Sequence, residues 1–161
     1  QDRQLAGIVP TMSIAENVTL AGLASRPRFG LRSPRTTRAA AQQTVDDLDI
    51  KIGDLGDPIT SLSGGNQQKA LLGRAIQTEP STLVLVAPTA GVDIASKATL
   101  LRAVTTIAEG GTAVLLVSDD TDDLRICDRV VVMFDGTPTT QLSAGFDDDQ
   151  LIAAMEGVVR S

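Results

Sequence analysis

The stretch Leu62 to Lys69 combines residue types that could hold an anion, in the order Leu-Ser-Gly-Gly-Asn-Gln-Gln-Lys. Gly64 and Gly65 let a backbone approach a ligand with no Cβ in the way, and Ser63 adds a hydroxyl. The run from Asn66 to Ile76 predicts a helix that begins at this loop, and a helix N-terminus offers unpaired N–H groups and the positive end of its dipole. The same pattern also fits an ordinary turn that starts a helix, so the local residues leave both interpretations open.

The whole octapeptide resembles the signature motif of ATP-binding-cassette (ABC) ATPases. Its Asn-Gln-Gln-Lys ending is similar to the variant in the second nucleotide-binding half of sugar-importer ATP-binding proteins, the ribose/galactose/xylose type. The general motif has Gln at the position of Asn66. The resemblance implies that Ser63, Gly64 and Gly65 contact the γ-phosphate of ATP held by the opposite half, and it places Asn66 among the cofactor-binding residues.

The run from Leu83 to Asp93 resembles the Walker B strand and D-loop of the same family. In the family the strand ends in Asp-Glu-Pro-Thr, where the Asp orders Mg²⁺ and the Glu polarises the attacking water. Here Val86 and Ala87 occupy those positions, and neither side chain can bind a hard cation or accept a proton. The frame survives in Pro88-Thr89 and in Gly91-Val92-Asp93, and the resemblance assigns Asp93 to the cofactor-binding set.

Two further departures bear on catalysis. The chain has no histidine, which excludes Ser-His-Asp and Cys-His catalysis and imidazole-ligated metal sites, and Ser118 stands where an active ABC site has its switch histidine. No G-x-x-x-x-G-K-[ST] sequence occurs, so the phosphate-cradling P-loop is missing. We therefore expect no catalytic residue and no metal site, with Val86, Ala87 and Ser118 as degenerate positions, and we expect this chain alone neither to bind Mg-ATP tightly nor to hydrolyse it.

The first residues resemble the segment from the Q-loop into the helical subdomain, through Gln1-Asp2-Arg3 and the run from Met12 to Asn17. The resemblance implies that Gln1 senses the γ-phosphate and that the adjoining surface faces the membrane subunits. Because the resemblance begins at the Q-loop, we expect the Walker A strand and its helix to be cut off or encoded elsewhere.

Hydrophobic periodicity predicts an α/β fold. Continuous apolar runs typical of strands buried on both faces of a parallel sheet alternate with helical patterns, and Asp135-Gly136 predicts a tight turn that opens a hairpin. The expected strands are Leu83–Val86, Ala113–Val117 and Val130–Phe134, and the expected helices are Arg35–Leu48, Asn66–Ile76, Ser96–Ala108, Asp122–Ile126 and one from Asp147.

With the resemblance, residues 1–161 read as a partial nucleotide-binding domain, an incomplete P-loop NTPase core that lacks the Walker A strand. Residues 14–80 form a helical subdomain with the signature motif, and residues 81–161 carry the Walker B-like strand, D-loop, switch region and C-terminal helix. In the family, the Walker A strand lies between the second and third of these strands. We therefore expect the first two to pair in parallel, the third to stand apart or close into the gap, and the isolated chain to self-associate through unpaired edges.

Composition limits the function classes. A length of 161 residues suits one domain, a net charge of −6 argues against nucleic-acid binding, and the single Cys127 excludes an internal disulfide and suits a reducing cytosol. No apolar run approaches the ~20 residues of a membrane span. A basic cluster reads as a solvated face or as a contact with a membrane-subunit loop or anionic lipid; its members are Arg26, Arg28, Arg32, Arg35 and Arg38.

Three functional interpretations stay open. The first is part of an ABC sugar-importer ATP-binding protein, which supplies the signature motif to a composite site for ATP and Mg²⁺. The second is a non-catalytic module that docks on membrane or ATPase subunits, and the third is a truncated product with no function by itself. The resemblance implies transmembrane permease subunits and the other nucleotide-binding half as partners, at the cytoplasmic face of the cell membrane.

Overall fold

The structure is a computed structural model that describes residues 7–22 and 34–156. These residues form two compact units. Of the described residues, the first unit contains those up to Leu83 and from Pro88 to Leu115, and the second contains Val84–Ala87 and those from Leu116 onward.

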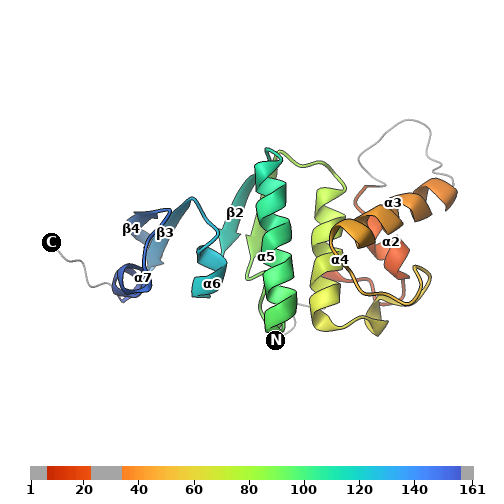
Figure 1. Ribbon diagram of the computed structural model, residues 1–161, viewed down its shortest axis with the longest axis horizontal. Helices are drawn as coiled ribbons and strands as arrows, with labels where there is room; N and C mark the ends of the chain where they lie inside the picture. The colour runs from red at the N-terminus through yellow and green to blue at the C-terminus, as the bar shows by residue number, and fades with distance from the viewer. Residues whose placement is uncertain (1–6, 23–33, 157–161) are drawn as a thin grey trace. The chain divides into compact units, whose positions relative to one another are not determined.

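Helices dominate the first unit, and three of them pack against one another (Figure 1). α2, α3 and α4 make this group, and α5 packs beside α4. α3 starts at Pro34, where a proline suits the first helical turn, and α4 starts at Gly64, two residues before its predicted start. The bounds are α2 Ile14–Thr19, α3 Pro34–Asp47, the 3₁₀ turn η1 Ile59–Ser61, α4 Gly64–Ile76 and α5 Ile94–Glu109.

The interior of the helical group is built from aliphatic residues, with one buried amide among them. Asn17 is 1% exposed, and its Nδ2 donates to the carbonyls of Val9, Met12 and Ser13 at 3.0, 3.2 and 3.0 Å. Its Oδ1 accepts from the Val9 N–H at 3.0 Å. A buried polar group of this kind must be fully hydrogen-bonded, and Asn17 thereby holds residues 9–13 against α2.

β1 (Thr82–Val86) and β2 (Ala113–Val117) form a two-stranded sheet. The Ala113 N–H donates to the Ser81 carbonyl at 3.0 Å, and the Ala87 N–H donates to the Val117 carbonyl at 2.7 Å. The two strands therefore start at the same end of the sheet, which confirms the predicted parallel pairing. α5 is the crossover helix that such a pair requires.

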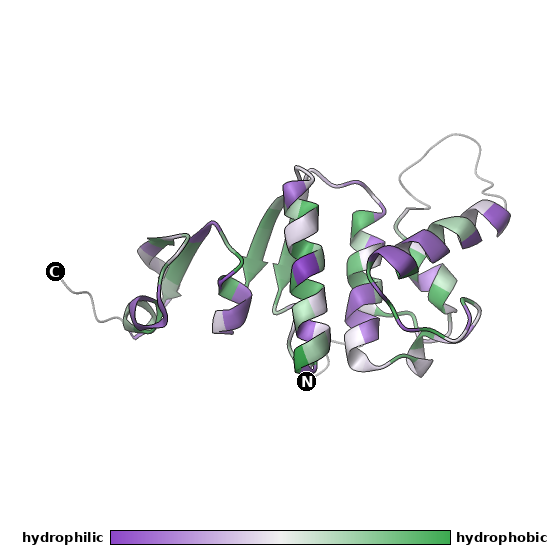
Figure 2. Ribbon diagram, in the orientation of Figure 1, coloured by the Kyte–Doolittle hydropathy of each residue, from purple (hydrophilic) through white to green (hydrophobic). Residues whose placement is uncertain are grey.

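The prediction that these strands are buried on both faces is wrong. Alternate residues are exposed, among them Val84 (57%), Val86 (64%), Leu115 (56%) and Val117 (50%), whereas Leu83 is buried. The strands are hydrophobic along their length (Figure 2). A strand buries both faces only where a second layer covers the sheet, and within the described residues the second face of these strands has no such layer.

The second unit contains an antiparallel hairpin of β3 (Arg129–Phe134) and β4 (Thr137–Ser143). Asp135 (φ 46°) and Gly136 (φ 76°) connect them, as the predicted turn requires, because two-residue hairpin loops favour positive φ at both positions. β3 and β4 form a sheet separate from β1 and β2. β3 therefore stands apart, which is one of the two outcomes expected for it.

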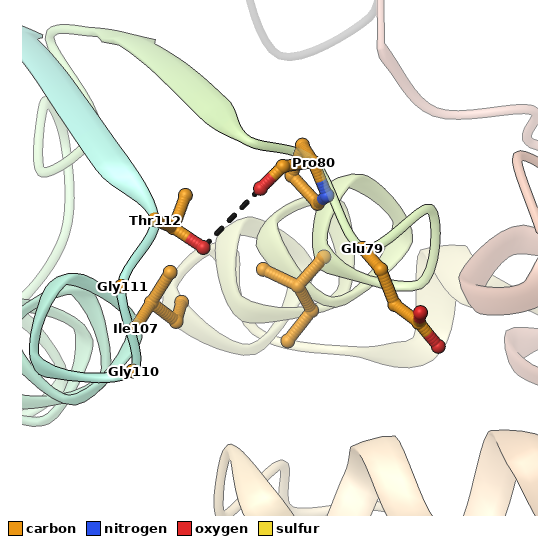
Figure 3. A pocket seen from close by; sticks show the side chains of 7 residues that line it. Glu79, Pro80, Ile107, Gly110, Gly111 and Thr112 are labelled. Carbon is orange, nitrogen blue, oxygen red and sulfur yellow. Dashed lines mark hydrogen bonds between the residues drawn. The ribbon is translucent and has the colours of Figure 1, made fainter.

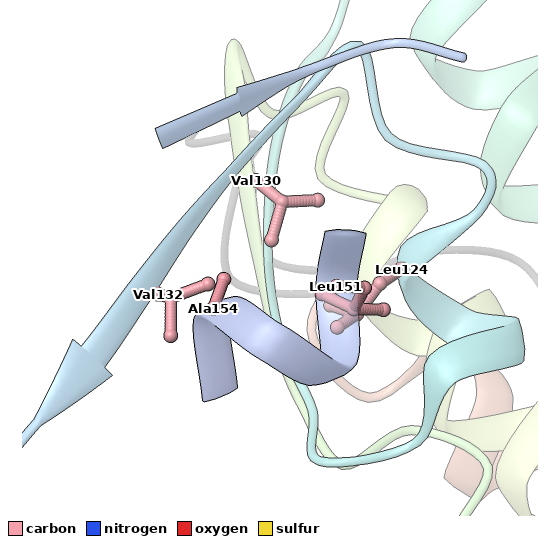
Figure 4. Close-up of a cluster of buried hydrophobic side chains, with 5 residues drawn as sticks. All are labelled: Leu124, Val130, Val132, Leu151 and Ala154. Carbon is pink, nitrogen blue, oxygen red and sulfur yellow. The ribbon is translucent and has the colours of Figure 1, made fainter. Parts of the chain in front are cut away.

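Two helices complete this unit, α6 (Thr121–Leu124) and α7 (Asp148–Met155). α6 ends two residues before its predicted end. Asp147 caps α7, accepting from the Gln150 N–H at 2.7 Å. α7 packs on one face of β3 (Figure 4), and the buried cluster there consists of Leu124, Val130, Val132, Leu151 and Ala154. Across the described residues, every helix is too short or too polar to serve as a membrane span.

Candidate functional site

The loop before α4 presents a serine and the first amides of a 13-residue helix. Ser63 is the N-cap residue (φ −61°, ψ 158°), but its side chain makes no capping hydrogen bond to the helix. The first-turn amides, those of Gly64, Gly65 and Asn66, precede the first residue that can bond within the helix. Ser63 is exposed, so its hydroxyl and these amides form a surface that suits an anion.

The Asn66 side chain joins Ser63 to the loop that follows α3. Its Nδ2 donates to Ser63 Oγ at 3.0 Å, and its Oδ1 accepts from the Lys51 backbone N–H at 3.0 Å. Asn66 belongs to the Leu62–Lys69 motif, whereas Lys51 lies outside it. The two are 15 residues apart, and the contact is made by a backbone group, which carries no signal in residue type.

Gly65 packs directly against the start of α5. A Cβ built at Gly65 would lie 2.6 Å from the Ser96 Cβ and 2.7 Å from its Oγ, distances at which real side chains clash. A glycine is therefore required for packing here, whatever its role towards a ligand. Through this contact the first turn of α4 and the segment that starts at Asp93 lie side by side.

Asp93 caps α5. Its carboxylate accepts from the Ser96 N–H at 3.0 Å, and the hydrogen bonds from the Ser96 backbone and side chain hold the pKa of the Asp93 carboxyl below its usual value. The structure thus brings Asp93 into the same unit as residues 63–66. The Asp93 carboxylate is already engaged as the N-cap of α5.

Lys69, the last residue of the motif, points into the protein. The residue is 5% exposed, and its Nζ donates to the Asp49 carbonyl at 2.9 Å. Burial of the ammonium group lowers the pKa of Lys69. Lys69 therefore anchors the loop after α3 on α4 and does not present its charge to a ligand at the exposed end of the helix.

Arg74 is a second anchor of α4 that sequence analysis missed. Its Nε donates to the Asn17 carbonyl and its Nη2 to Asn17 Oδ1, both at 2.7 Å, and its Nη1 donates to the Gly7 carbonyl. Desolvation of the guanidinium lowers the pKa of Arg74. The available signal was an arginine within the small and apolar run from Ala70 to Ile76, because such a side chain needs several acceptors when it is partly buried.

The residues at the end of β1 cannot hold a metal. Val86 is exposed and offers a hydrocarbon, and Ala87 (φ 46°) offers a methyl group. Mg²⁺ requires oxygen ligands, so the side chains at these two positions do not fit the ion. Across the part of the chain that the structure describes, no group of three or more His, Cys, Asp or Glu side chains could hold a metal.

Ser118 is engaged in local structure. Its Oγ donates to Asp123 Oδ2 at 2.8 Å and accepts from the Asp120 N–H at 3.1 Å, and Asp123 is fully buried. Val86, Ala87 and Ser118 all belong to the second unit, whereas residues 63–66 and Asp93 belong to the first. Ser118 thus links β2 to α6 and has no hydroxyl hydrogen to spare for a ligand.

Some expectations fall on residues that the structure does not describe. Gln1 lies outside the described ranges, as do Arg26, Arg28 and Arg32 of the basic cluster. Of the other two, Arg38 pairs with Asp54 at 2.9 Å, and both side chains are more than half exposed. This pair is a solvated contact of the kind that stabilises a protein little.

A cavity of about 440 Å³ lies at the other end of α4 (Figure 3). Ile76 and Pro80 line it from the α4 side and Ile107 from the α5 side, and Thr112 Oγ1 donates to the Pro80 carbonyl at 3.2 Å across it. Since α4 rises about 1.5 Å per residue, the cavity lies far from Ser63. It is separate from the loop that contains Ser63.

Known proteins match the chain in sequence and in fold. It is 36% identical over 153 residues to the ribose import ATP-binding protein RbsA of Rhodococcus jostii, covering 94% of this chain and 30% of that protein. It is 35% identical over 159 residues to the ribose import ATP-binding protein RbsA 2 of Streptomyces avermitilis, covering 98% of this chain and 32% of that protein. No protein-family model matches the chain.

A solved structure shows the same fold. A dimeric ATP-binding cassette in a post-hydrolysis state with ADP and Pi superposes with a TM-score of 0.77 at 23% identity, covering 89% of this chain and 62% of that one. At this identity the likeness establishes the α/β fold of an ABC ATPase cassette and nothing more specific. The chain spans 30% to 32% of the length of the relatives above.

Proposed function

Because the chain is homologous to a segment of ABC-type ribose import ATP-binding proteins and shares the cassette fold, we propose that it is the C-terminal part of a second nucleotide-binding half of a sugar importer. In this role it supplies the signature loop to ATP held by another half. The bound ATP is the source of free energy for uptake. The sugar is ribose or a related sugar, by analogy with the names of the relatives.

The observation that carries this proposal is the state of Ser63. Its side chain is exposed, does not cap α4, and stands beside the first-turn amides of a helix. Together with the dipole of α4, these groups offer hydrogen bonds and a partial positive charge to one phosphate group. The fixed backing of the loop by Ser96 and Lys51 keeps these donors in place before the ligand arrives.

The chain's residues do not fit the metal part of the reaction. Val86 and Ala87 carry no oxygen for Mg²⁺, and the sequence has no P-loop. We propose that the Mg²⁺ ligands and the phosphate cradle of this site come from the other half. This chain contributes donors to the terminal phosphate and closes the site on one side.

An alternative is a module that docks without supporting hydrolysis. The observation in its favour is the exposed apolar face of β1, with Val84 and Val86 more than half exposed, since an exposed apolar patch marks an association surface. A truncated product with no function of its own is the third interpretation. In the first two cases we propose permease subunits and the other nucleotide-binding half as partners, at the cytoplasmic face of the membrane.

A chimera tests the proposal. This chain replaces the homologous 153-residue segment of the Rhodococcus jostii ribose import protein, and ATP hydrolysis and ribose uptake are measured with the cognate permease. We expect the chimera to be active and Ser63→Arg to lower turnover about 100-fold, the size of the loss when one donor that stabilises transition-state charge is removed from an enzyme. Gln68→Arg adds the same charge to the helix end and serves as the control.

The outcomes separate the three interpretations. Activity that Ser63→Arg abolishes supports the signature role. An assembled chimera whose turnover is unchanged by the Ser63→Arg substitution supports docking without a composite site. A chimera that does not assemble with the permease, although the parent protein does, supports the truncated product.

A further inference from the structure

We propose that Asn66 is a positioning residue that turns the Ser63 hydroxyl outward, so that it donates its hydrogen to a phosphate oxygen. The inference rests on the proposed function of the signature loop. It adds a role for Asn66 that is different from direct contact with ATP, and it brings in the Lys51 backbone, which lies outside the motif.

The neighbours of the Asn66 side chain fix the orientation of its amide group. A backbone N–H can only donate, and the Lys51 N–H lies 3.0 Å from the Asn66 side chain. The atom that faces Lys51 must therefore be Oδ1. The NH₂ group then faces Ser63, 3.0 Å from its Oγ.

The contact with Asn66 determines where the Ser63 hydroxyl hydrogen can point. Because the Asn66 NH₂ group only donates, Ser63 Oγ must accept, and its own hydrogen must point elsewhere. Among the described residues, no acceptor receives that hydrogen, and the side chain does not cap α4. The hydroxyl hydrogen is thus available on an exposed residue, where a phosphate oxygen is an acceptor of the required kind.

Two hydrogen bonds hold the residues before Lys51 in place. Lys69 Nζ donates to the Asp49 carbonyl at 2.9 Å, and the Ile50 N–H donates to the Val45 carbonyl at 2.9 Å. The two residues before Lys51 are thus fixed to α4 and α3. The direction of the Lys51 N–H, and through it the Asn66 amide, is set by the packed part of the first unit.

A double-mutant cycle in the ribose-importer chimera tests the inference. We expect Ser63→Ala and Asn66→Ala each to lower ATP turnover, Asn66→Ala by about fivefold, the effect of one neutral hydrogen bond. In the Ser63→Ala background, Asn66→Ala should lower turnover no further, because the hydroxyl it orients is gone. Coupling of this kind distinguishes a residue that acts through Ser63 from one that acts separately.

Asn66→Asp gives a second readout. A carboxylate accepts from both neighbours, so it would draw the Ser63 hydrogen inward while keeping the bond from Lys51. We expect a larger loss than for Asn66→Ala, and a small effect from Gln68→Glu, which places the same charge in the same turn. In the full chain, the Lys51 amide resonance should shift in Asn66→Ala and stay in place in Ser63→Ala.

The outcomes are distinguishable from a failure of the proposed function. If Ser63→Ala leaves turnover unchanged, the signature role itself is wrong. Suppose that Ser63→Ala lowers turnover. The inference is then overturned if Asn66→Ala lowers turnover by the same factor with and without the Ser63 hydroxyl, or if it lowers turnover in neither background, because Asn66 would not act through Ser63. Equal losses for Asn66→Asp and Gln68→Glu would also overturn it, since charge alone would then explain them.

Discussion

Arg74 on α4 donates from Nη2 to the side-chain oxygen of Asn17 on α2 at 2.7 Å, across 57 positions of the sequence. Its Nε donates to the Asn17 carbonyl, so the guanidinium is hydrogen-bonded to both the backbone oxygen and the side-chain oxygen of Asn17. Asn17 in turn holds residues 9–13 through its NH₂ group. The helix that begins after Ser63 is thereby connected to the segment that precedes α2.

Replacing this guanidinium should destabilise the first unit. Arg74→Lys keeps the charge but cannot reach both Asn17 acceptors and the Gly7 carbonyl, so at least one acceptor loses its partner. We expect the free energy of unfolding to fall by about 2 kcal/mol, measured by urea denaturation. Arg102→Lys, which removes a hydrogen bond to Thr99 on the exposed side of α5, should change it by less than about 0.5 kcal/mol. Equal effects of the two variants would contradict the anchoring role.

Gly65 should tolerate no side chain. Gly65→Ala places a Cβ within 2.6 Å of the Ser96 Cβ, and we expect a loss of about 1–3 kcal/mol from overpacking. Ser96→Gly removes the atoms that clash, so the double variant should recover part of the stability lost by Gly65→Ala. A double variant whose loss of stability equals or exceeds the sum of the two single losses would show that the contact is not the cause.

Stability should depend on the ionisation of Asp93. Its pKa is lowered in the folded state, so the carboxylate stabilises the fold above the ordinary Asp pKa of about 3.9, and this contribution is lost as the pH falls through the lowered value. Asn is an equally good N-cap and does not titrate. The urea midpoint of Asp93→Asn should therefore fall less steeply than that of the unaltered chain below about pH 4. Parallel curves would contradict the assignment.

Carboxylates placed at the positions that resemble the family's Walker B pair should not make this chain an ATPase. Val86→Asp with Ala87→Glu supplies a metal ligand and a base, but the phosphate cradle is still missing from the sequence. We expect no tight Mg-ATP binding by isothermal titration and no phosphate release above background, for both the unaltered chain and the double variant. Micromolar binding by either would mean that the nucleotide site lies elsewhere.

Much of the fold could be predicted from the sequence because the signals are local. Pro34, Asp147 and Asp135-Gly136 each mark an element boundary through backbone preferences that act over a few residues. The exposure of Val84 and Val86 could not be predicted, because burial depends on a second layer and the apolar run is the same with or without it. The apolar pattern shows which side chains a strand can bury. It does not show whether another layer of the fold covers them.

The site shows the same division. The position of Ser63 at the start of a helix follows from the glycines and the apolar run after them. The contacts that fix the loop do not follow from the sequence, because Lys51 contributes a backbone N–H and Arg74 reaches Asn17 from a distant part of the chain. Such contacts depend on the packing of α2, α3 and α4, and residue types alone did not specify it.

We propose that Ser63 lies against the terminal phosphate of ATP bound to another half. Vanadate trapped with Mg-ADP at that position cleaves nearby backbone on illumination, so the ribose-importer chimera can be trapped, irradiated and its fragments identified by mass spectrometry. We expect cleavage at Ser63, lost in the absence of vanadate and reduced in Ser63→Ala. Cleavage confined to the P-loop of the other half, with the chain intact from Leu62 to Asn66, would contradict it.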